Sequence, residues 1–194
     1  MPDILDELRL ERNESIYRDP SIPPASKEKI LDAIARSAYN YERSYSGCTR
    51  SVLSAINDHL YLVPKDAFEY CFKASSTLPG GIARMGEVCG TLTGALMAIG
   101  LAFGPEKPQD TQKYATVMKL ARQFFQKFNE KFEQFKCREL LKKLVGKSYD
   151  FWNPQDREEW IRNGGPEKCA LLCAEVARMA AEFIIEVKER QSSS

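Results

Sequence analysis

Apolar residues recur every three or four positions along most of the chain, which is the period of an amphipathic α-helix. Residues 26–44 place Ile30, Ile34 and Ala38 on one face and predict the first helix of the main body. A second helix is predicted before Pro64 and a third after it, because proline is favoured at a first helical position. No run of residues alternates with the period of a strand. The pattern therefore predicts an all-α fold, a compact single-domain bundle of about six to eight helices.

Later segments extend this pattern. The apolar run over residues 88–103 predicts a buried helix, and it is shorter than the ~18 residues that a membrane span needs. Residues 111–135 predict a long amphipathic helix, and shorter helical segments follow from residue 137 and over 156–162, before a last helix that ends near residue 189. The side chains expected to face the interior are Ala67, Phe68 and Cys71 in the third helix, and Val117, Leu120, Phe124, Phe128, Phe132 and Phe135 in the long one.

Prolines and serines mark the ends of the body. Residues 1–25 are expected to form an N-terminal arm or one short peripheral helix, because prolines between positions 20 and 24 separate them from the rest. Residues 26–190 are expected to form one helical domain that contains all six cysteines. Residues 191–194 are expected to form a disordered tail. No internal repeat is visible.

Charge and composition exclude several classes of function. With 28 Lys+Arg against 27 Asp+Glu, the net charge of +1 gives no overall attraction to nucleic acid. The lysines of the phenylalanine-rich helix are interpreted as a solvated face and not as a nucleic-acid platform. The single histidine, His59, rules out a Ser-His-Asp nucleophile, an HExxH zinc site and a CxxCH haem site within this sequence. Sulfur is then the best candidate to carry chemistry.

The first twelve residues, MPDILDELRLER, contain interleaved acids and no apolar run, so no secretory signal is expected. A cytoplasmic location is predicted, where stable disulfides are rare. Six cysteines in such a chain favour metal binding or redox chemistry. The alternative is that each cysteine is simply a small buried hydrophobic residue.

Four cysteines fall at or near predicted helix starts: Cys48, Cys89, Cys137 and Cys169. Free backbone N–H groups and the positive end of the helix dipole stabilise an anion at such a position. We therefore expect the pKa of these thiols to be lowered, which would make them better metal ligands and nucleophiles. Cys173 lies four residues after Cys169, so the two share a helix face and could bind one metal.

Glycines spaced by four precede and follow Cys89. Gly86, Gly90 and Gly94, continued by Ala98, predict a helical stripe with almost no side chain. Each glycine within a helix costs about 0.8–1.0 kcal/mol relative to alanine, so the stripe needs a reason. One reason is the close approach of a neighbouring helix. The other is room beside Cys89 for a bulky inorganic centre or a partner thiol, with loop N–H groups donating hydrogen bonds to sulfur.

Together these segments resemble a known family. The chain resembles the C_GCAxxG_C_C family in four successive segments. They are GCTRSVLSAI from residue 47, GGIARMGEVCGTLTGALMAIGLAFG, CREL from residue 137 and a cysteine before EVARMAAEFI. Members of this family carry four characteristic cysteines and a CGAxxG signature, in which this chain has Thr91 in place of the alanine. The resemblance implies a small helical bundle with four converging sulfurs. It also implies a redox role, with an iron–sulfur cluster as the expected cofactor, because a similar module holds one in relatives fused to haem domains.

The leading hypothesis is thus a redox-type domain that binds an iron–sulfur cluster or another thiophilic metal for electron transfer or redox sensing. Its metal ligands would be Cys48, Cys89, Cys137 and Cys173, with Cys169 as the other choice for the fourth, and Gly86 and Gly90 would lie beside the cofactor. A redox partner protein is expected, and neither nucleic acid nor a membrane. The alternatives are metal-free thiol–disulfide exchange and a helical interaction module with structural cysteines. No catalytic residue is identified, and both enzymatic turnover and the oligomeric state, a dimer included, are left open.

Overall fold

The computed structural model describes residues 24–192. Within them the chain forms eight α-helices and no strand, which confirms the all-α prediction. The helices are α2 (Pro24–Tyr45), α3 (Cys48–Leu60), α4 (Lys65–Ser75), α5 (Gly90–Phe103), α6 (Thr111–Phe132), α7 (Cys137–Val145), α8 (Pro154–Arg162) and α9 (Gly165–Ser192). Most of the predicted arm lies outside the described residues, as do the last two residues of the predicted tail, and α9 continues through residues 191 and 192.

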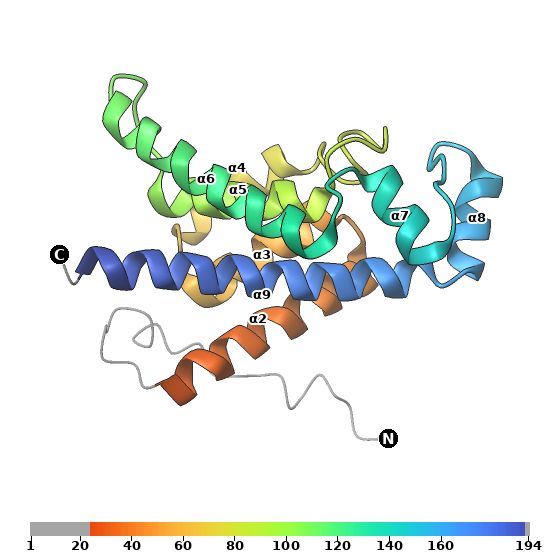
Figure 1. Ribbon diagram of the computed structural model, residues 1–194, viewed down its shortest axis with the longest axis horizontal. Helices are drawn as coiled ribbons and strands as arrows, with labels where there is room; N and C mark the ends of the chain where they lie inside the picture. The colour runs from red at the N-terminus through yellow and green to blue at the C-terminus, as the bar shows by residue number, and fades with distance from the viewer. Residues whose placement is uncertain (1–23, 193–194) are drawn as a thin grey trace.

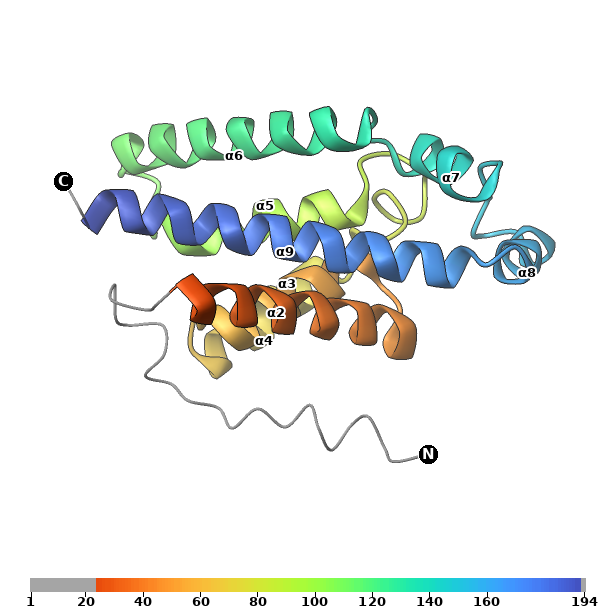
Figure 2. The ribbon, with the colours of Figure 1, turned by 60° about the horizontal axis from the view of Figure 1, so that its bottom comes forward.

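The long C-terminal helix α9 runs along the whole bundle (Figures 1 and 2). Helices α2 and α3 pack along one side of it and α5 and α6 along the other, with α2 making the most extensive contact. Helices α7 and α8 sit at the end where α9 begins, and α4 packs against α3. The bundle is therefore organised around one helix that touches nearly every layer.

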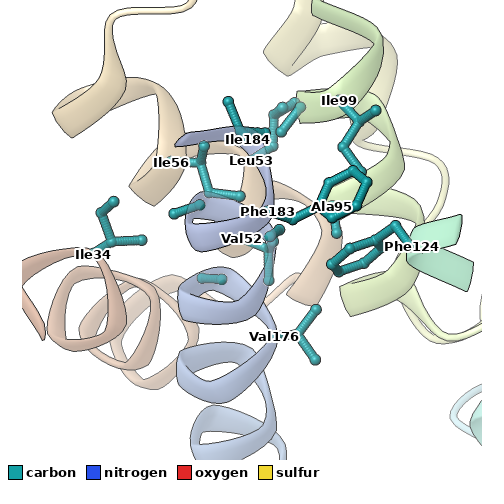
Figure 3. Packing of buried hydrophobic residues seen from close by; sticks show 14 of the residues in the cluster. Ile34, Val52, Leu53, Ile56, Ala95, Ile99, Phe124, Val176, Phe183 and Ile184 are labelled. Atoms are coloured by element: carbon teal, nitrogen blue, oxygen red, sulfur yellow. The ribbon is translucent and has the colours of Figure 1, made fainter. Parts of the chain in front are cut away.

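The core is built from the apolar faces that the sequence period predicts (Figure 3). Six helices contribute fully buried or nearly buried side chains to it, among them Ile34, Val52, Leu53, Ile56, Ala95, Ile99, Phe124, Val176, Phe183 and Ile184. Phe124 and Phe128 of α6 are fully buried, as predicted, whereas Leu120 and Phe132 are only partly buried. Phe135 follows the end of α6 and packs its ring on Phe125, with 5.1 Å between the ring centroids.

The structure corrects the prediction that Ala67, Phe68 and Cys71 of the third helix face the interior. Helix α4 lies at the rim of the bundle, and it contributes one buried residue, Ser75. Ala67 is exposed, and Phe68 and Cys71 are half-buried. The period of the sequence marks a helix correctly here, but it does not tell how much of that helix the rest of the fold covers.

Two glycines of the predicted stripe let α3 and α5 approach closely. A Cβ atom at Gly94 would lie 2.6 Å from the carbonyl oxygen of Thr49 and 3.1 Å from Cβ of Val52. Gly90 faces the first turn of α3 in the same way, and a Cβ there would lie 2.8 Å from Thr49 Oγ1. The neighbouring-helix interpretation is thus correct for both positions. Gly86 precedes α5 and has a positive φ of 73°, so the prediction that it belongs to the helical stripe is wrong.

Replacing the two helical glycines at positions 94 and 100 should have opposite effects on stability. Gly94→Ala is expected to lower the free energy of unfolding by about 1–3 kcal/mol, the usual cost of overpacking, because α3 must move away. Gly100→Ala is expected to raise it by about 0.8–1.0 kcal/mol, since a Cβ there meets no atom within 4 Å and alanine favours the helix. Urea unfolding followed by far-UV circular dichroism measures both, and an unchanged Gly94→Ala protein would contradict the close approach.

Candidate functional site

A left-handed loop precedes α5 and forms one wall of the site. Residues 80–84 all have positive φ, from 49° to 74°, and three of them are not glycine. Each non-glycine residue in this conformation costs roughly 1–2 kcal/mol, and Ile82 is also β-branched. Gly81 is required here, because a Cβ would lie 2.8 Å from Cβ of Cys137 and 2.5 Å from the amide nitrogen of Glu87. The strained loop thus presses directly against a cysteine.

A short antiparallel bridge joins this loop to the start of α7. Val88 pairs with Lys136, and the bridge is closed by hydrogen bonds from the Cys89 N–H to the Phe135 carbonyl (2.8 Å) and from the Cys137 N–H to the Glu87 carbonyl (2.6 Å). Cys89 and Cys137 each follow directly after a bridge residue, and their thiols are close enough to interact electrostatically. Two cysteines that are far apart in sequence are brought together by backbone pairing.

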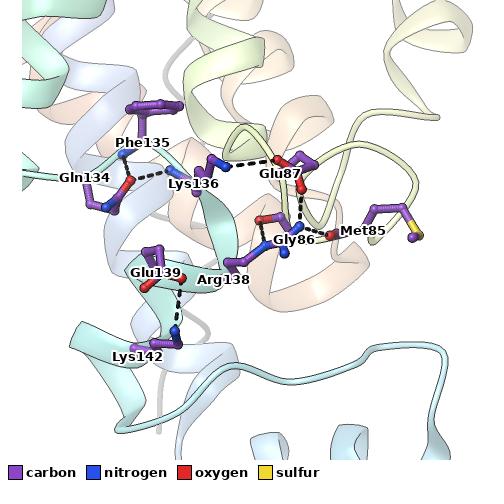
Figure 4. A network of polar contacts seen from close by, with 9 residues as sticks. All are labelled: Met85, Gly86, Glu87, Gln134, Phe135, Lys136, Arg138, Glu139 and Lys142. Carbon is purple, nitrogen blue, oxygen red and sulfur yellow. Dashed lines mark hydrogen bonds and ion pairs between the residues drawn. The ribbon is translucent and has the colours of Figure 1, made fainter.

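Polar contacts on the outer side hold the bridge in place (Figure 4). The Arg138 guanidinium donates to the carbonyl oxygens of Met85 (2.9 Å) and Gly86 (3.1 Å) and forms an ion pair with Glu87. Lys136 lies 3.6 Å from the other oxygen of Glu87. Gly86 packs beneath Arg138, where a Cβ would lie 3.1 Å from Cβ of that residue. Gly86 therefore shapes the loop that packs against Cys137.

Cys48 enters the site from the first turn of α3. Its sulfur lies against Gly90, so closely that a Cβ on that residue would overlap Sγ. The bare helix surface at Gly90 is therefore occupied by a thiol, which is one of the two uses expected for the glycine stripe. The backbone of Gly80, in the left-handed loop, faces this sulfur and opposes the rise in the pKa of Cys48 that burial causes.

Helix α9 supplies the last two thiols, and all six cysteines are free. Cys89 occupies the centre of the arrangement, since its thiol interacts electrostatically with those of four other cysteines: Cys48, Cys137, Cys169 and Cys173. Cys89, Cys137 and Cys173 are buried, and Cys48 and Cys169 are half-buried. Cys71, on α4, is not part of this five-thiol cluster. The sequence-predicted cysteines are thus brought together, and both Cys169 and Cys173 are included.

A buried carboxylate stands beside the five-thiol cluster, and the sequence-based reasoning missed it. Glu42, near the end of α2, is 9% exposed. Its Oε2 accepts a hydrogen bond of 2.9 Å from the Ser51 hydroxyl. Burial raises the pKa of the Glu42 carboxyl, and the Ser51 hydroxyl and the Gly47 backbone oppose this rise. A signal was present: Glu42 follows Ile34 and Ala38 at intervals of four on the apolar face of α2.

Burial decides the protonation of these thiols. Desolvation raises the pKa of Cys137 to about 12 and raises the pKa values of Cys48, Cys169 and Cys173 well above the ordinary range. The pKa of Cys89 is raised by burial as well, although hydrogen bonds from Thr91 and from the Leu92 N–H oppose this shift. The expectation of lowered thiol pKa values at helix starts is therefore wrong, because the desolvation outweighs the helix N–H groups. Without a bound metal, the five clustered thiols are neutral at pH 7.

The residue that departs from the CGAxxG signature touches the central thiol. The Thr91 hydroxyl lies 3.2 Å from Cys89 Sγ. Thr91 is itself buried, at 1% exposure. An alanine at this position would leave the sulfur without that hydrogen bond. The substitution seen in the sequence therefore adds a polar partner to the central cysteine.

Other candidate groups lie elsewhere. His59 is half-buried at the end of α3, with Nε2 3.0 Å from the Ser37 hydroxyl, and burial lowers its pKa. Within residues 24–192, no group of three or more His, Cys, Asp or Glu side chains is arranged to hold a metal ion. None of the described helices has the length and apolar character needed to cross a bilayer.

A known protein family matches most of this chain. Residues 46–183 match the model of a family described as "Putative redox-active protein (C_GCAxxG_C_C)". This match spans most of the described chain and all five cysteines of the cluster, so the chain belongs to the C_GCAxxG_C_C family. Neither the curated proteins nor the solved structures contained a match.

The raised thiol pKa values predict a loss of stability at alkaline pH in the metal-free protein. An unfolded chain releases thiol protons near pH 8.5, while the folded chain keeps them. The folded state therefore binds more protons above that pH, and its free energy of unfolding should fall as pH rises from 8 to 10, by up to about 1.4 kcal/mol per pH unit and thiol. Urea unfolding under anaerobic, reducing conditions measures this slope.

Single cysteine variants separate the cluster from other causes of alkaline destabilisation. Cys173→Ala should make the fall with pH shallower, because one raised thiol is removed. Cys71→Ala should leave the slope as in the unmodified protein, since Cys71 lies outside the cluster. Equal slopes in the two variants would contradict the assignment of raised pKa values to the clustered thiols.

Proposed function

We propose that this protein is a cytoplasmic redox protein whose clustered cysteines bind an iron–sulfur cluster or another thiophilic metal, for electron transfer or redox sensing. The observation that carries the proposal is the gathering of five thiols from four separate segments around Cys89. Thiolate sulfur is the preferred ligand of iron–sulfur clusters, zinc and Cu(I), so the chemistry of the donor set fits. A reducing compartment would keep all six cysteines available as free thiols.

The proposed ligands are Cys48, Cys89, Cys137 and Cys173. Cys173 is preferred over Cys169 because it is fully buried and interacts with both Cys48 and Cys89. Cys169 instead packs partly into a second apolar cluster around α7 and the following loop. Among residues 24–192, no three His, Cys, Asp or Glu side chains are arranged to hold a single ion, so such an ion would need thiols to rotate. The cysteines that hold a multi-iron cluster stand farther apart.

The protonation of the thiols favours metal binding over thiol–disulfide exchange. Exchange needs a thiolate, and burial keeps these thiols neutral at pH 7. A metal cation stabilises the thiolate directly, so each cysteine that binds it releases one proton to solvent. A purely structural role is also disfavoured, because burying the Glu42 carboxyl next to a packing cluster would only cost free energy.

A centre held by Cys48, Cys89, Cys137 and Cys173 would supply one-electron chemistry between a reduced carrier protein and an oxidised acceptor protein. No bond within the chain is made or broken. Hydrogen bonds to sulfur tune the reduction potential of such a centre, and the Gly80 backbone and the Thr91 hydroxyl are in position to supply them. A redox partner protein is therefore part of the proposed function.

Anaerobic reconstitution with iron and sulfide tests the proposal. The full chain should gain charge-transfer absorption in the visible range together with protein-bound iron and sulfide. Cys48→Ser, Cys89→Ser and Cys137→Ser should each lose most of this absorption, because each removes a ligand. Cys71→Ser is the matched control and should behave as the unmodified protein. A reconstituted chain without bound metal, or equal loading in all four variants, would overturn the proposal.

The hydroxyl beside Cys89 should tune the reduction potential of the bound centre. A hydrogen bond to a ligand sulfur stabilises the reduced, more negative state, so Thr91→Ala should lower the midpoint potential. The expected shift is roughly 20–60 mV, the one-electron equivalent of a net hydrogen bond of about 0.5–1.5 kcal/mol. Thr91→Ser keeps the hydroxyl and should stay near the original value. Redox titration of the reconstituted proteins measures the shift, and a Thr91→Ala potential equal to that of Thr91→Ser would refute it.

A further inference from the structure

Helix α4 lies at the edge of the bundle, on the side away from α6 (Figure 2). Its buried and half-buried side chains recur every three or four residues and lie toward the body of the bundle: Phe68, Cys71 and Ser75. The opposite face, which we call the outer face of α4, consists of Asp66, Tyr70 and Lys73. All three side chains are exposed, and Tyr70 is 74% exposed. A large aromatic ring therefore stands in water at the centre of this face.

The charged side chains of α4 have no ion-pair partner within residues 24–192. They are Lys65, Asp66, Glu69 and Lys73. On the outer face, Asp66 stands in the first turn of the helix and Lys73 in the last, with Lys73 Nζ 5.4 Å from the centroid of the Tyr70 ring. The two charges are about 10 Å apart along the helix axis, so they do not pair with each other. The face thus carries an unpaired acid at one end and an unpaired base at the other.

Exposed aromatic side chains gather around α4. Of the six that are exposed in the described part of the chain, four lie on this helix or beside it: Tyr45, Tyr61, Tyr70 and Phe72. Arg50 joins two of them, since its guanidinium donates to the Tyr45 carbonyl (3.4 Å) and lies over the Phe72 ring, 5.4 Å from the centroid. Tyrosine, phenylalanine and arginine are enriched where proteins bind one another. The composition of this region therefore indicates a protein partner.

The charges of the outer face are complementary to themselves when their order is reversed. A second copy related by a two-fold axis beside Tyr70 runs its α4 antiparallel to the first. Asp66 then stands opposite Lys73 of the second copy, and Lys73 stands opposite its Asp66, because the two positions are almost equally far from Tyr70. The two Tyr70 rings meet beside the axis, where an aromatic pair is favourable. A parallel copy would instead place acid against acid and base against base.

We propose that the outer face of α4 is a homodimer interface, in which two copies of this chain pack α4 against α4 in antiparallel orientation. The inference is independent of the proposed metal centre. A pair of 11-residue helices covers less than the ~1,600 Å² of a standard interface, so we expect a dissociation constant in the micromolar range. Because ion pairs contribute, the association should weaken as ionic strength rises.

Sedimentation velocity of the full chain, over a concentration range of roughly 1–200 μM, tests the proposal. A reductant is present throughout, so that disulfides cannot link the copies. The chain should pass from monomer to dimer as its concentration rises. Tyr70→Ala should weaken the dimer by at least about 10-fold, because it removes the central aromatic contact. Tyr114→Ala is the matched control, since it removes a tyrosine of α6 that is 57% exposed, and it should leave the dissociation constant unchanged.

Charge reversal tests the antiparallel pairing. Asp66→Lys and Lys73→Asp each place like charges opposite one another, so each variant alone should form a homodimer at least about 10-fold weaker. An equimolar mixture of the two variants should associate as well as the unmodified chain. In that mixture a copy with two lysines at these positions faces a copy with two aspartates, and both ion pairs form again. Association of the mixture also requires α4 to be folded in both variants, which separates the pairing from a loss of helix.

Three results would contradict the interface. A chain that stays monomeric at the highest concentration would overturn the proposal. Equal dissociation constants for Tyr70→Ala and Tyr114→Ala would overturn it as well, because such a dimer would use another face. A mixture of the charge variants that associates no better than either variant alone would overturn the antiparallel pairing of Asp66 with Lys73.

Discussion

The close contact between α3 and α5 is the constraint on which the rest of the site depends. Because Gly90 and Gly94 carry no side chain, the first turns of both helices can meet, and the sulfur of Cys48 rests against the backbone at Gly90. That contact brings Cys48 and Cys89 together at the starts of the two helices. Ser51, in the first turn of α3, donates a hydrogen bond to the Glu42 carboxyl of α2. The two glycines thus decide how closely Cys48 and Cys89 approach each other.

The second feature that determines the site is the strained left-handed loop over residues 80–84, whose conformation is held by contacts on its outer surface. Left-handed backbone over residues 80–84 is unfavourable by itself, yet it brings the Gly80 backbone to Cys48 and lets Cys137 pack against Gly81. The bridge between Val88 and Lys136, with the contacts of Arg138, offsets this strain and ties α7 to the loop. Strain of this kind persists only where surrounding contacts over-determine the conformation, and such places concentrate at functional sites.

Electrostatics in the site are dominated by desolvation. Three thiols stand at helix starts, where N–H groups favour an anion, and their pKa values are nevertheless raised because the sulfurs are removed from water. The consequence is a cluster that is neutral without metal and well suited to a cation that replaces several protons at once. Burial raises the pKa of the Glu42 carboxyl for the same reason.

The helical period alone determined the all-α class, the approximate helices and most of the core faces, since local spacing decides which side of a helix is apolar. It also singled out the cysteines and the glycines near Cys89 as unusual, because those residue types are costly or reactive wherever they occur. It did not determine that α4 lies at the rim, that Gly86 belongs to a loop, or that thiols at helix starts would be desolvated. Nor did it connect Glu42 with the sulfurs, although its place on the apolar face of α2 was visible. Burial and proximity are set by how helices pack on one another, and that depends on contacts between residues far apart in the chain, which only the tertiary structure decides.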